Sequence, residues 1–258
     1  MSSRDGWERS QLEDDGFADS GESFTPEAWE PLARAFTAYF RGDSGATLLV
    51  HSDVGGPEAT PVALFFRSRP GLRDVDRVAL DLARGRILDG GAGVGSLALL
   101  LQEGGMDVTA AEVIPEAVDI MKARGVRNPH LGSLESLPSH CSFDTILLLM
   151  NGSALAGTLG RFPALLRTLE SLLRPGGQVL MDSTDLGWEE LEGGGEPYLG
   201  EVHYQMEFEG VRGAPFPQLF LDAGTLARLV GEEGWEVELV WEGEDGEYLA
   251  RLTLRGHP

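Results

Sequence analysis

Strand-like and helical apolar segments alternate from residue 86 to residue 185, and this alternation constrains the fold more than any other feature. The segments RILDG, DVTAAEV, FDTILLLM and QVLMDSTD are short apolar runs typical of buried strands. Between them lie VGSLALLLQEGG, PEAVDIMKARG and RFPALLRTLESLLRPGG, which have helical spacing and end in glycine or Pro-Gly-Gly. Continuous apolar strands separated by helices predict an α/β fold with a mostly parallel, twisted sheet and helices on both faces.

The segments on either side of this core are assigned from composition and local signals. Residues 1–23 are polar and acidic, and we expect a disordered tail there. Residues 24–73 should form a helix that begins at Thr25-Pro26-Glu27, followed by strand or irregular structure that covers the sheet. Residues 74–258 are expected to form the main domain. It should open with a short helix, contain inserted strands at about 198–222, and close with a helix and an antiparallel hairpin joined by EDG.

Charge and composition exclude several classes of protein. The formal net charge is −22, and Lys122 is the only lysine, so a nucleic acid partner is not expected. No apolar run is long enough to cross a bilayer, and the N-terminus does not have the pattern of a secretory signal. The single cysteine, Cys141, suits a reducing compartment, so we expect a cytoplasmic protein. No oligomeric state is predicted.

The acidity between residues 186 and 247 has two interpretations. The acidic residues create an electrostatic field that favours a cationic substrate, or they are ordinary solvated side chains of the surface. The second interpretation is favoured. The histidines and Cys141 do not have the spacing of metal ligands, so no metal is expected.

The stretch ILDGGAGVG ends the first strand of the predicted sheet and continues as a glycine-rich loop. In open α/β sheets ligands bind outside the carboxyl ends of the strands, where Asp89, Gly91, Gly93 and Gly95 are expected. The next strand ends in Glu112, whose carboxylate can accept hydrogen bonds from both hydroxyls of a ribose. Three interpretations of the glycine-rich loop are open: it binds a nucleoside, it binds a dinucleotide, or it binds no ligand. Alternatively, Asp89 only caps a turn and Glu112 is a surface acid. Ser96 stands where a dinucleotide fingerprint has its last glycine.

Taken together, LDGGAGVG, Glu112, FDTILLLM and LLRPGGQVLMD resemble the motifs of class I S-adenosylmethionine-dependent methyltransferases over residues 74–185. The resemblance implies a Rossmann-like fold and S-adenosylmethionine as cofactor. It places Gly91 and Gly93 against the amino-acid and sulfonium portion, and Glu112 on the ribose. Val113 would supply an apolar edge for the base, and Ser133 and Leu134 would lie beside adenine. Ser133 replaces the acid that the family often has there.

The residues expected near the reacting methyl group are few. Asn151 follows the FDTILLLM strand and either orients the cofactor or a substrate, or only closes a turn with Gly152. The Pro-Pro-aromatic sequence of many DNA- and protein-amine methyltransferases does not follow it, which disfavours nucleobase and glutamine amides and favours a small-molecule acceptor. His203, in the inserted strand, is a candidate general base.

Two alternatives of other classes stay open at this point: an NAD(P)-dependent enzyme, and a module that binds S-adenosylmethionine without catalysis. The N-terminal helix and PVALFF would form a lid over the cofactor or simply cover one face of the sheet.

Overall fold

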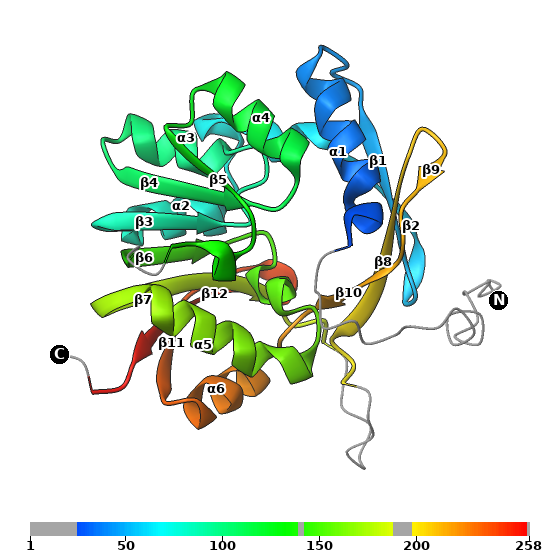
Figure 1. Ribbon diagram of the computed structural model, residues 1–258. Helices are drawn as coiled ribbons and strands as arrows, with labels where there is room; N and C mark the ends of the chain where they lie inside the picture. The colour runs from blue at the N-terminus through cyan, green and yellow to red at the C-terminus, as the bar shows by residue number, and fades with distance from the viewer. Residues whose placement is uncertain (1–24, 139–141, 188–197, 257–258) are drawn as a thin grey trace.

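The part of the chain that the structure describes forms two β-sheets, a main sheet with helices on both faces and a smaller sheet beside it (Figure 1). A computed structural model describes residues 25–138, 142–187 and 198–256. The expected disordered tail and Cys141 lie outside these ranges.

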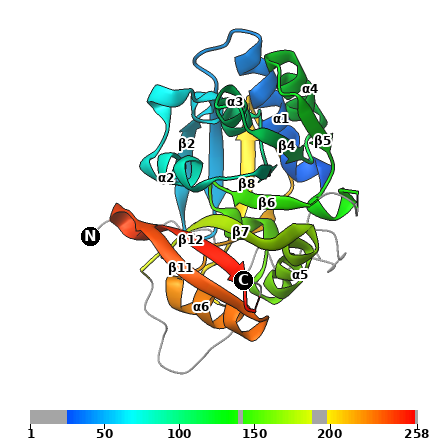
Figure 2. The same cartoon turned by 90° about the vertical axis from the view of Figure 1, so that its left-hand side faces the viewer.

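The main sheet has the strand order β11-β12-β7-β6-β3-β4-β5. Strands β5, β4, β3, β6 and β7 are parallel, β12 is antiparallel to β7, and β11 is antiparallel to β12 (Figure 2). The strands are β3 Arg86–Gly90, β4 Asp107–Glu112, β5 Asn128–Leu131, β6 Phe143–Leu148, β7 Leu173–Thr184, β11 Trp235–Glu242 and β12 Glu247–Leu254. The predicted α/β fold with a closing antiparallel hairpin is therefore confirmed.

Helices cover both faces of this sheet because its strands are apolar on both sides. Leu147 and Leu180 pack with α2 (Asp74–Leu82), α3 (Ser96–Glu103) and α4 (Pro115–Arg124) on one face. Their strand neighbours Leu148 and Met181 pack with α5 (Phe162–Leu172) and α6 (Ala223–Glu232) on the other face. Successive strand residues point to opposite faces, so a doubly covered sheet needs the unbroken apolar runs seen in the sequence.

The smaller sheet brings together two segments that are far apart in the chain. Its order is β10-β8-β1-β2, with β9 paired to β8. The N-terminal strands are β1 Thr47–Ser52 and β2 Gly55–Pro61, and the inserted strands are β8 Glu201–Phe208, β9 Val211–Arg212 and β10 Phe216–Leu219. Helix α1 (Pro26–Phe40) lies between this sheet and α4 (Figure 1). We call α1, β1, β2, the short 3₁₀ helix η2 (Val62–Phe66) and β8–β10 the cap.

An apolar cluster attaches the cap to helix α4 beside the main sheet. Leu32 and Phe36 of α1 pack with Met206 of β8 and with Ile114 and Ile120, which lie at the start of α4 and within it. All five side chains are at most 7% exposed. Helix α1 therefore joins the smaller sheet to α4 through a shared apolar core.

Three local details differ from the sequence-based expectation. Strand β5 forms between PEAVDIMKARG and FDTILLLM, where no strand was predicted. Strand β7 begins at Leu173 within the expected end of a helix, and PVALFF forms the 3₁₀ helix η2. In β5 and at the start of β7, pairing with a neighbouring strand sets the structure, since neither stretch is a continuous apolar run. At the start of α1, the Thr25 side chain makes no capping hydrogen bond, although Pro26 occupies the expected first position.

Candidate functional site

The glycine loop lies at the carboxyl end of β3, as expected for a ligand site in a parallel sheet. Gly91, Gly93 and Gly95 have φ angles of +70°, +54° and +77°, which favour glycine. A Cβ at Gly95 would lie 2.7 Å from Val126 Cγ2, so this glycine lets α3 pack closely on its neighbours. A Cβ at Gly93 would meet nothing within 4 Å, so this glycine faces open space that a ligand can enter.

Glu112 ends β4 and is only 6% exposed, so it is not an ordinary surface acid. Its Oε1 accepts hydrogen bonds from the Val113 and Ile114 N–H groups at 2.7 and 3.0 Å, and its Oε2 accepts one from Gly93 N–H at 2.8 Å. Burial raises the pKa of Glu112, and these three N–H groups oppose the rise. Glu112 therefore holds the glycine loop and the start of α4. Its Oε1 already accepts two hydrogen bonds, so Oε2 is the oxygen that retains capacity to accept from a ligand hydroxyl.

Asp89 lies in β3 immediately before the glycine loop and is 3% exposed. Burial raises its pKa to about 7, although the Arg67 guanidinium and the Ala98 N–H oppose this shift. Within the described part of the chain, Asp89 Oδ2 makes no hydrogen bond. A buried oxygen of this kind is costly unless a ligand supplies a donor.

The residues expected beside adenine follow β5. Leu134 is 5% exposed, and its Cδ2 would lie 3.2 Å from a Cβ at Gly90, so it contacts the carboxyl end of β3. Ser133 is exposed, and its carbonyl accepts hydrogen bonds from Ser136. Asp89, Glu112 and Leu134 thus converge on the glycine loop from three neighbouring strand ends.

Asn151 follows β6 in a turn with left-handed backbone, where φ is +68° at Met150 and +63° at Asn151. Its Nδ2 donates to the Leu219 carbonyl of β10 at 3.1 Å. Its Oδ1 accepts from the hydroxyls of Ser153 and Ser183 at 2.9 and 3.2 Å. The side chain therefore joins β6, β7 and the cap, which suits a positioning role better than direct contact with a substrate.

His203 is oriented by a residue that the sequence did not point to, Asp53. His203 N–H donates to Asp53 Oδ1 at 3.0 Å, and its Nδ1 lies 3.3 Å from Asp53 Oδ2. The next residue, Tyr204, projects to the opposite face of β8 and joins an aromatic group with Phe216. His203 therefore points away from that aromatic group.

The aromatic group consists of Trp29, Tyr204, Phe216 and Phe220, all partly buried. The ring centroids of Trp29 and Phe216 are 4.9 Å apart, and those of Tyr204 and Phe220 are 6.1 Å apart. Burial raises the pKa of Tyr204, and the carboxylates of Glu58 and Asp53 add to this rise. The Tyr204 hydroxyl is therefore a neutral hydrogen bond donor at ordinary pH.

A family model for a methyltransferase domain matches residues 66–240, more than half of the chain. The chain belongs to this methyltransferase family. A solved S-adenosylmethionine-dependent methyltransferase from Bacteroides fragilis, in complex with S-adenosyl-L-homocysteine, is 37% identical and has a TM-score of 0.82. The match covers 90% of this chain and 98% of that chain. No match was found among curated proteins.

More distant structures share the fold of this methyltransferase. The CcbJ methyltransferase from Streptomyces caelestis is 15% identical with a TM-score of 0.55, and covers 70% of this chain and 88% of that one. An S-adenosylmethionine-dependent methyltransferase from Clostridium acetobutylicum is 12% identical with a TM-score of 0.53, covering 69% and 87%. The Rossmann-like methyltransferase fold and S-adenosylmethionine as cofactor, both implied by the sequence motifs, are confirmed.

The methyltransferase also contains a buried ion network that sequence inspection missed. Arg67 Nε lies 2.9 Å from Asp76 Oδ2, and Arg73 pairs with Asp76, Asp182 and Glu247 at 2.7, 3.2 and 2.9 Å. Arg67, Asp76 and Asp182 are each at most 9% exposed. No local motif signals this network, because its members come from the end of η2, α2, β7 and β12.

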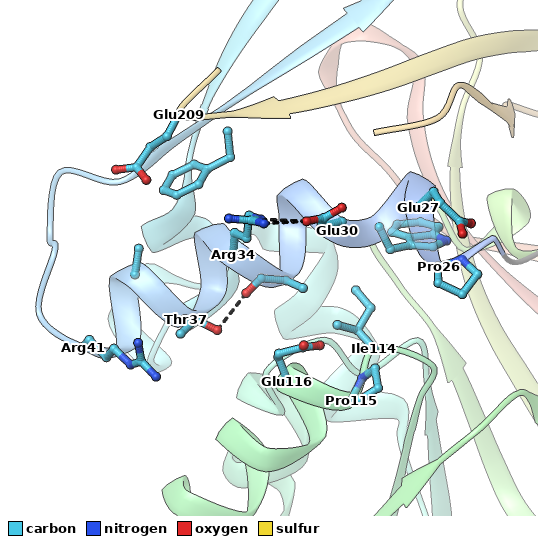
Figure 3. A pocket seen from close by; sticks show the side chains of 14 residues that line it. Pro26, Glu27, Glu30, Arg34, Thr37, Arg41, Ile114, Pro115, Glu116 and Glu209 are labelled. Carbon is cyan, nitrogen blue, oxygen red and sulfur yellow. Dashed lines mark hydrogen bonds and ion pairs between the residues drawn. The ribbon is translucent and has the colours of Figure 1, made fainter. Parts of the chain in front are cut away.

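A groove of about 770 Å³ runs along α1 of the methyltransferase, beside the start of α4 and the end of β8 (Figure 3). Glu30, Arg34 and Glu116 line it, and Arg34 is paired with Glu30 (Figure 3).

In the ranges that the structure describes, no group of three His, Cys, Asp or Glu residues is arranged to hold a metal. Among the helices of those ranges, none has the length and apolar character that crossing a membrane requires.

Proposed function

We propose that this S-adenosylmethionine-dependent methyltransferase methylates a small molecule held between the cofactor and the cap. The observation that carries the proposal is that the cap contacts the main domain at two places beside the glycine loop, the start of α3 and the turn after β6. The Ser96 hydroxyl at the start of α3 donates to the Phe65 carbonyl of η2 at 2.6 Å. On the other side, Asn151 donates to the Leu219 carbonyl of β10. A covered site favours a small acceptor over a macromolecule.

The residues of the glycine loop fit the cofactor well. Open space at Gly93 allows backbone to approach the amino-acid and sulfonium portion, and the unpaired oxygen of Asp89 suits the cofactor's ammonium group. Glu112 would accept from the ribose through Oε2, while Val113, Ser133 and Leu134 would lie beside adenine. Gly91 would also lie against the amino-acid and sulfonium portion, whereas Gly95 would contribute by allowing α3 to pack closely on its neighbours.

The bound cofactor supplies an electrophilic methyl group on its sulfonium. The protein then has to hold the acceptor atom in line with that methyl group, so positioning contributes much of the rate. The aromatic group would provide an apolar wall for the acceptor, with Tyr204 donating a hydrogen bond. Asn151 would position the turn after β6. His203 stays a candidate base, although its orientation away from the aromatic group speaks against this role.

Calorimetric titration tests the cofactor assignments. S-adenosylmethionine, S-adenosylhomocysteine, NADH and NADPH would be titrated into the wild type, Glu112→Ala and the control Glu116→Ala, which changes an exposed acid of α4. Loss of the ribose contact should weaken binding of the first two ligands by about 1.5–3 kcal/mol. Equal affinity in Glu112→Ala and the wild type would contradict the ribose contact, and the control should bind normally.

A transfer assay tests the acceptor. Cofactor labelled in the methyl group would be incubated with panels of small amines, thiols, phenols and carboxylates, and separately with protein and nucleic acid. Label in a small molecule supports the proposal. Label found only in macromolecules would overturn it.

A further inference from the structure

Two consecutive residues with left-handed backbone lie at the acceptor edge of the cofactor site. Met150 and Asn151 have φ angles of +68° and +63°, which cost free energy in residues other than glycine. The next residue must be glycine for a different reason, because a Cβ at Gly152 would lie 2.6 Å from Leu148 Cβ. Such strain persists only where surrounding contacts enforce it, and it gathers at functional sites.

Asp182 provides those contacts from the neighbouring strand. It is 1% exposed, and its Oδ2 accepts from Met150 N–H at 3.0 Å while its Oδ1 accepts from Gly152 N–H at 2.9 Å. One carboxylate therefore holds the N–H groups on both sides of Asn151. Burial raises the pKa of Asp182, and the charge of Arg73 opposes that rise.

The same turn is held from the cap by Arg67, which follows η2. One guanidinium nitrogen, Nη1, lies 3.0 Å from Met150 Sδ and donates to the Leu64 carbonyl at 2.8 Å. The other side of the guanidinium pairs with Asp76, which pairs with Arg73, and Arg73 returns to Asp182. The contacts form a closed ring: Met150, Asp182, Arg73, Asp76, Arg67 and again Met150.

We propose that Arg67 and Asp182 are positioning residues that tie the Met150–Gly152 turn to the cap segment 62–67, so that these two walls of the site are ordered together. If the two walls were held by unconnected side chains, loss of one contact would disorder one wall only. In a buried ring of charges, removal of one member leaves its partners with unpaired charge, so the contacts of the other wall weaken as well. The proposal depends on the proposed function only in placing the acceptor beside this turn. Amide hydrogen exchange measured without an acceptor tests the two separately.

Amide hydrogen exchange of the full chain, free and with S-adenosylhomocysteine, measures the coupling directly. Arg67→Gln should accelerate exchange in a peptide that contains Met150–Gly152 by about tenfold, although Arg67 bonds neither of those N–H groups. Asp182→Asn should accelerate exchange in residues 62–67 as well as in the turn. Arg69→Gln and Asp185→Asn are the matched controls, since they change exposed residues close to each site.

The alternative is that each residue stabilises only its own surroundings. In that case Arg67→Gln would accelerate exchange only within residues 62–76, and Asp182→Asn only around the turn, and the proposal would be overturned. Should Arg67→Gln fail to fold, Arg67→Lys retains a cation beside Asp76 but has only one nitrogen to donate. It should still accelerate exchange at the turn, and unchanged exchange there would also overturn the proposal.

Binding gives a second readout that simple destabilisation does not produce. In the wild type, S-adenosylhomocysteine should slow exchange in both the cap segment and the turn. In Arg67→Gln at saturating ligand, protection should persist at the glycine loop and be lost at the turn. Full protection of the turn in that variant would contradict the coupling while leaving the proposed function intact.

Discussion

The raised pKa of Asp89, beside the glycine loop, should make the stability of the folded protein depend on pH. The pKa of Asp89 is raised from 3.8 to about 7 by burial, so the folded protein binds this proton more tightly than the unfolded chain does. The folded state then carries more protons on this group between pH 4 and 7, and the group's contribution to the free energy of unfolding falls as pH rises through that window. The fall should have a slope of up to about 1.4 kcal/mol per pH unit.

Denaturant unfolding of the cofactor-free protein between pH 4 and 8 measures this slope. The free-energy difference between the wild type and Asp89→Asn should change with pH across the window, because other buried carboxylates titrate in both proteins. Asp81→Asn, an exposed change on α2, should parallel the wild type. A pH-independent difference between wild type and Asp89→Asn would show that the Asp89 pKa is not raised.

Gly93 and Gly95 share a backbone conformation but should respond differently to substitution. Gly95→Ala places a methyl group 2.7 Å from Val126 Cγ2 and should lower the free energy of unfolding by about 2–4 kcal/mol through overpacking and backbone strain. Gly93→Ala meets open space and carries only the backbone strain of its positive φ, so it should lower the free energy of unfolding by about 1–2 kcal/mol and also weaken binding of S-adenosylhomocysteine. Urea unfolding and calorimetry measure the two effects, and normal binding in Gly93→Ala would remove Gly93 from the cofactor contact.

Among single residues of the candidate site, those that end a strand could be identified most directly from the sequence. Asp89 and Glu112 were recognisable because each follows an apolar run at the edge where parallel strands place ligands. That Glu112 accepts three backbone N–H groups could not be predicted, since this depends on how the loop folds back onto α4. The Arg73–Asp182 and His203–Asp53 pairs join distant positions, and no local pattern marks such pairs.

At the scale of elements, periodicity predicted the helices and buried strands of the main sheet because each carries its own apolar pattern. Strand β5 carries none, with two exposed and two partly buried residues, and depends on pairing with β4. The 3₁₀ helix η2 has an apolar run that suits several structures, and contacts of Phe65 with Phe36 and Ser96 select among them. Short elements were therefore missed where tertiary contacts outweigh local preference.

The junction between the β6 turn and β10 yields an element-scale prediction. Ser153 is fully buried, and its hydroxyl lies within 2.9 Å of Asn151 Oδ1, Ser183 Oγ and the Leu219 carbonyl. Ser153→Ala should lower the free energy of unfolding by about 1–3 kcal/mol because buried acceptors lose a donor. Ser171→Ala, which removes an exposed hydroxyl bond within α5, should have little effect in the same urea titration. Equal stability of the two variants would contradict the importance of this junction.

At the scale of the whole molecule, the cap was only half predictable. Inserted strands near 198–222 and covering structure before residue 73 were both expected, but their union in one sheet was not. Leu49 pairs with Glu207 across more than half of the chain, and β-strand pairing at such separation has no signature in a single sequence. The main domain was predictable because its contacts follow the order of its elements.

The lid hypothesis can be tested on the whole molecule, because the structure shows what α1 covers. Deleting residues 1–45 would uncover Ile114, Met206 and Phe208, which are at most 4% exposed, so we expect lower thermal stability and loss of S-adenosylhomocysteine binding. Deleting residues 1–24, which leaves α1 in place, should preserve both. Phe36→Ala, at a side chain 1% exposed, is a milder change that should cost about 3–5 kcal/mol and weaken binding. If the 1–45 deletion folds and binds the ligand as tightly as the full chain, α1 only covers the structure and is no lid.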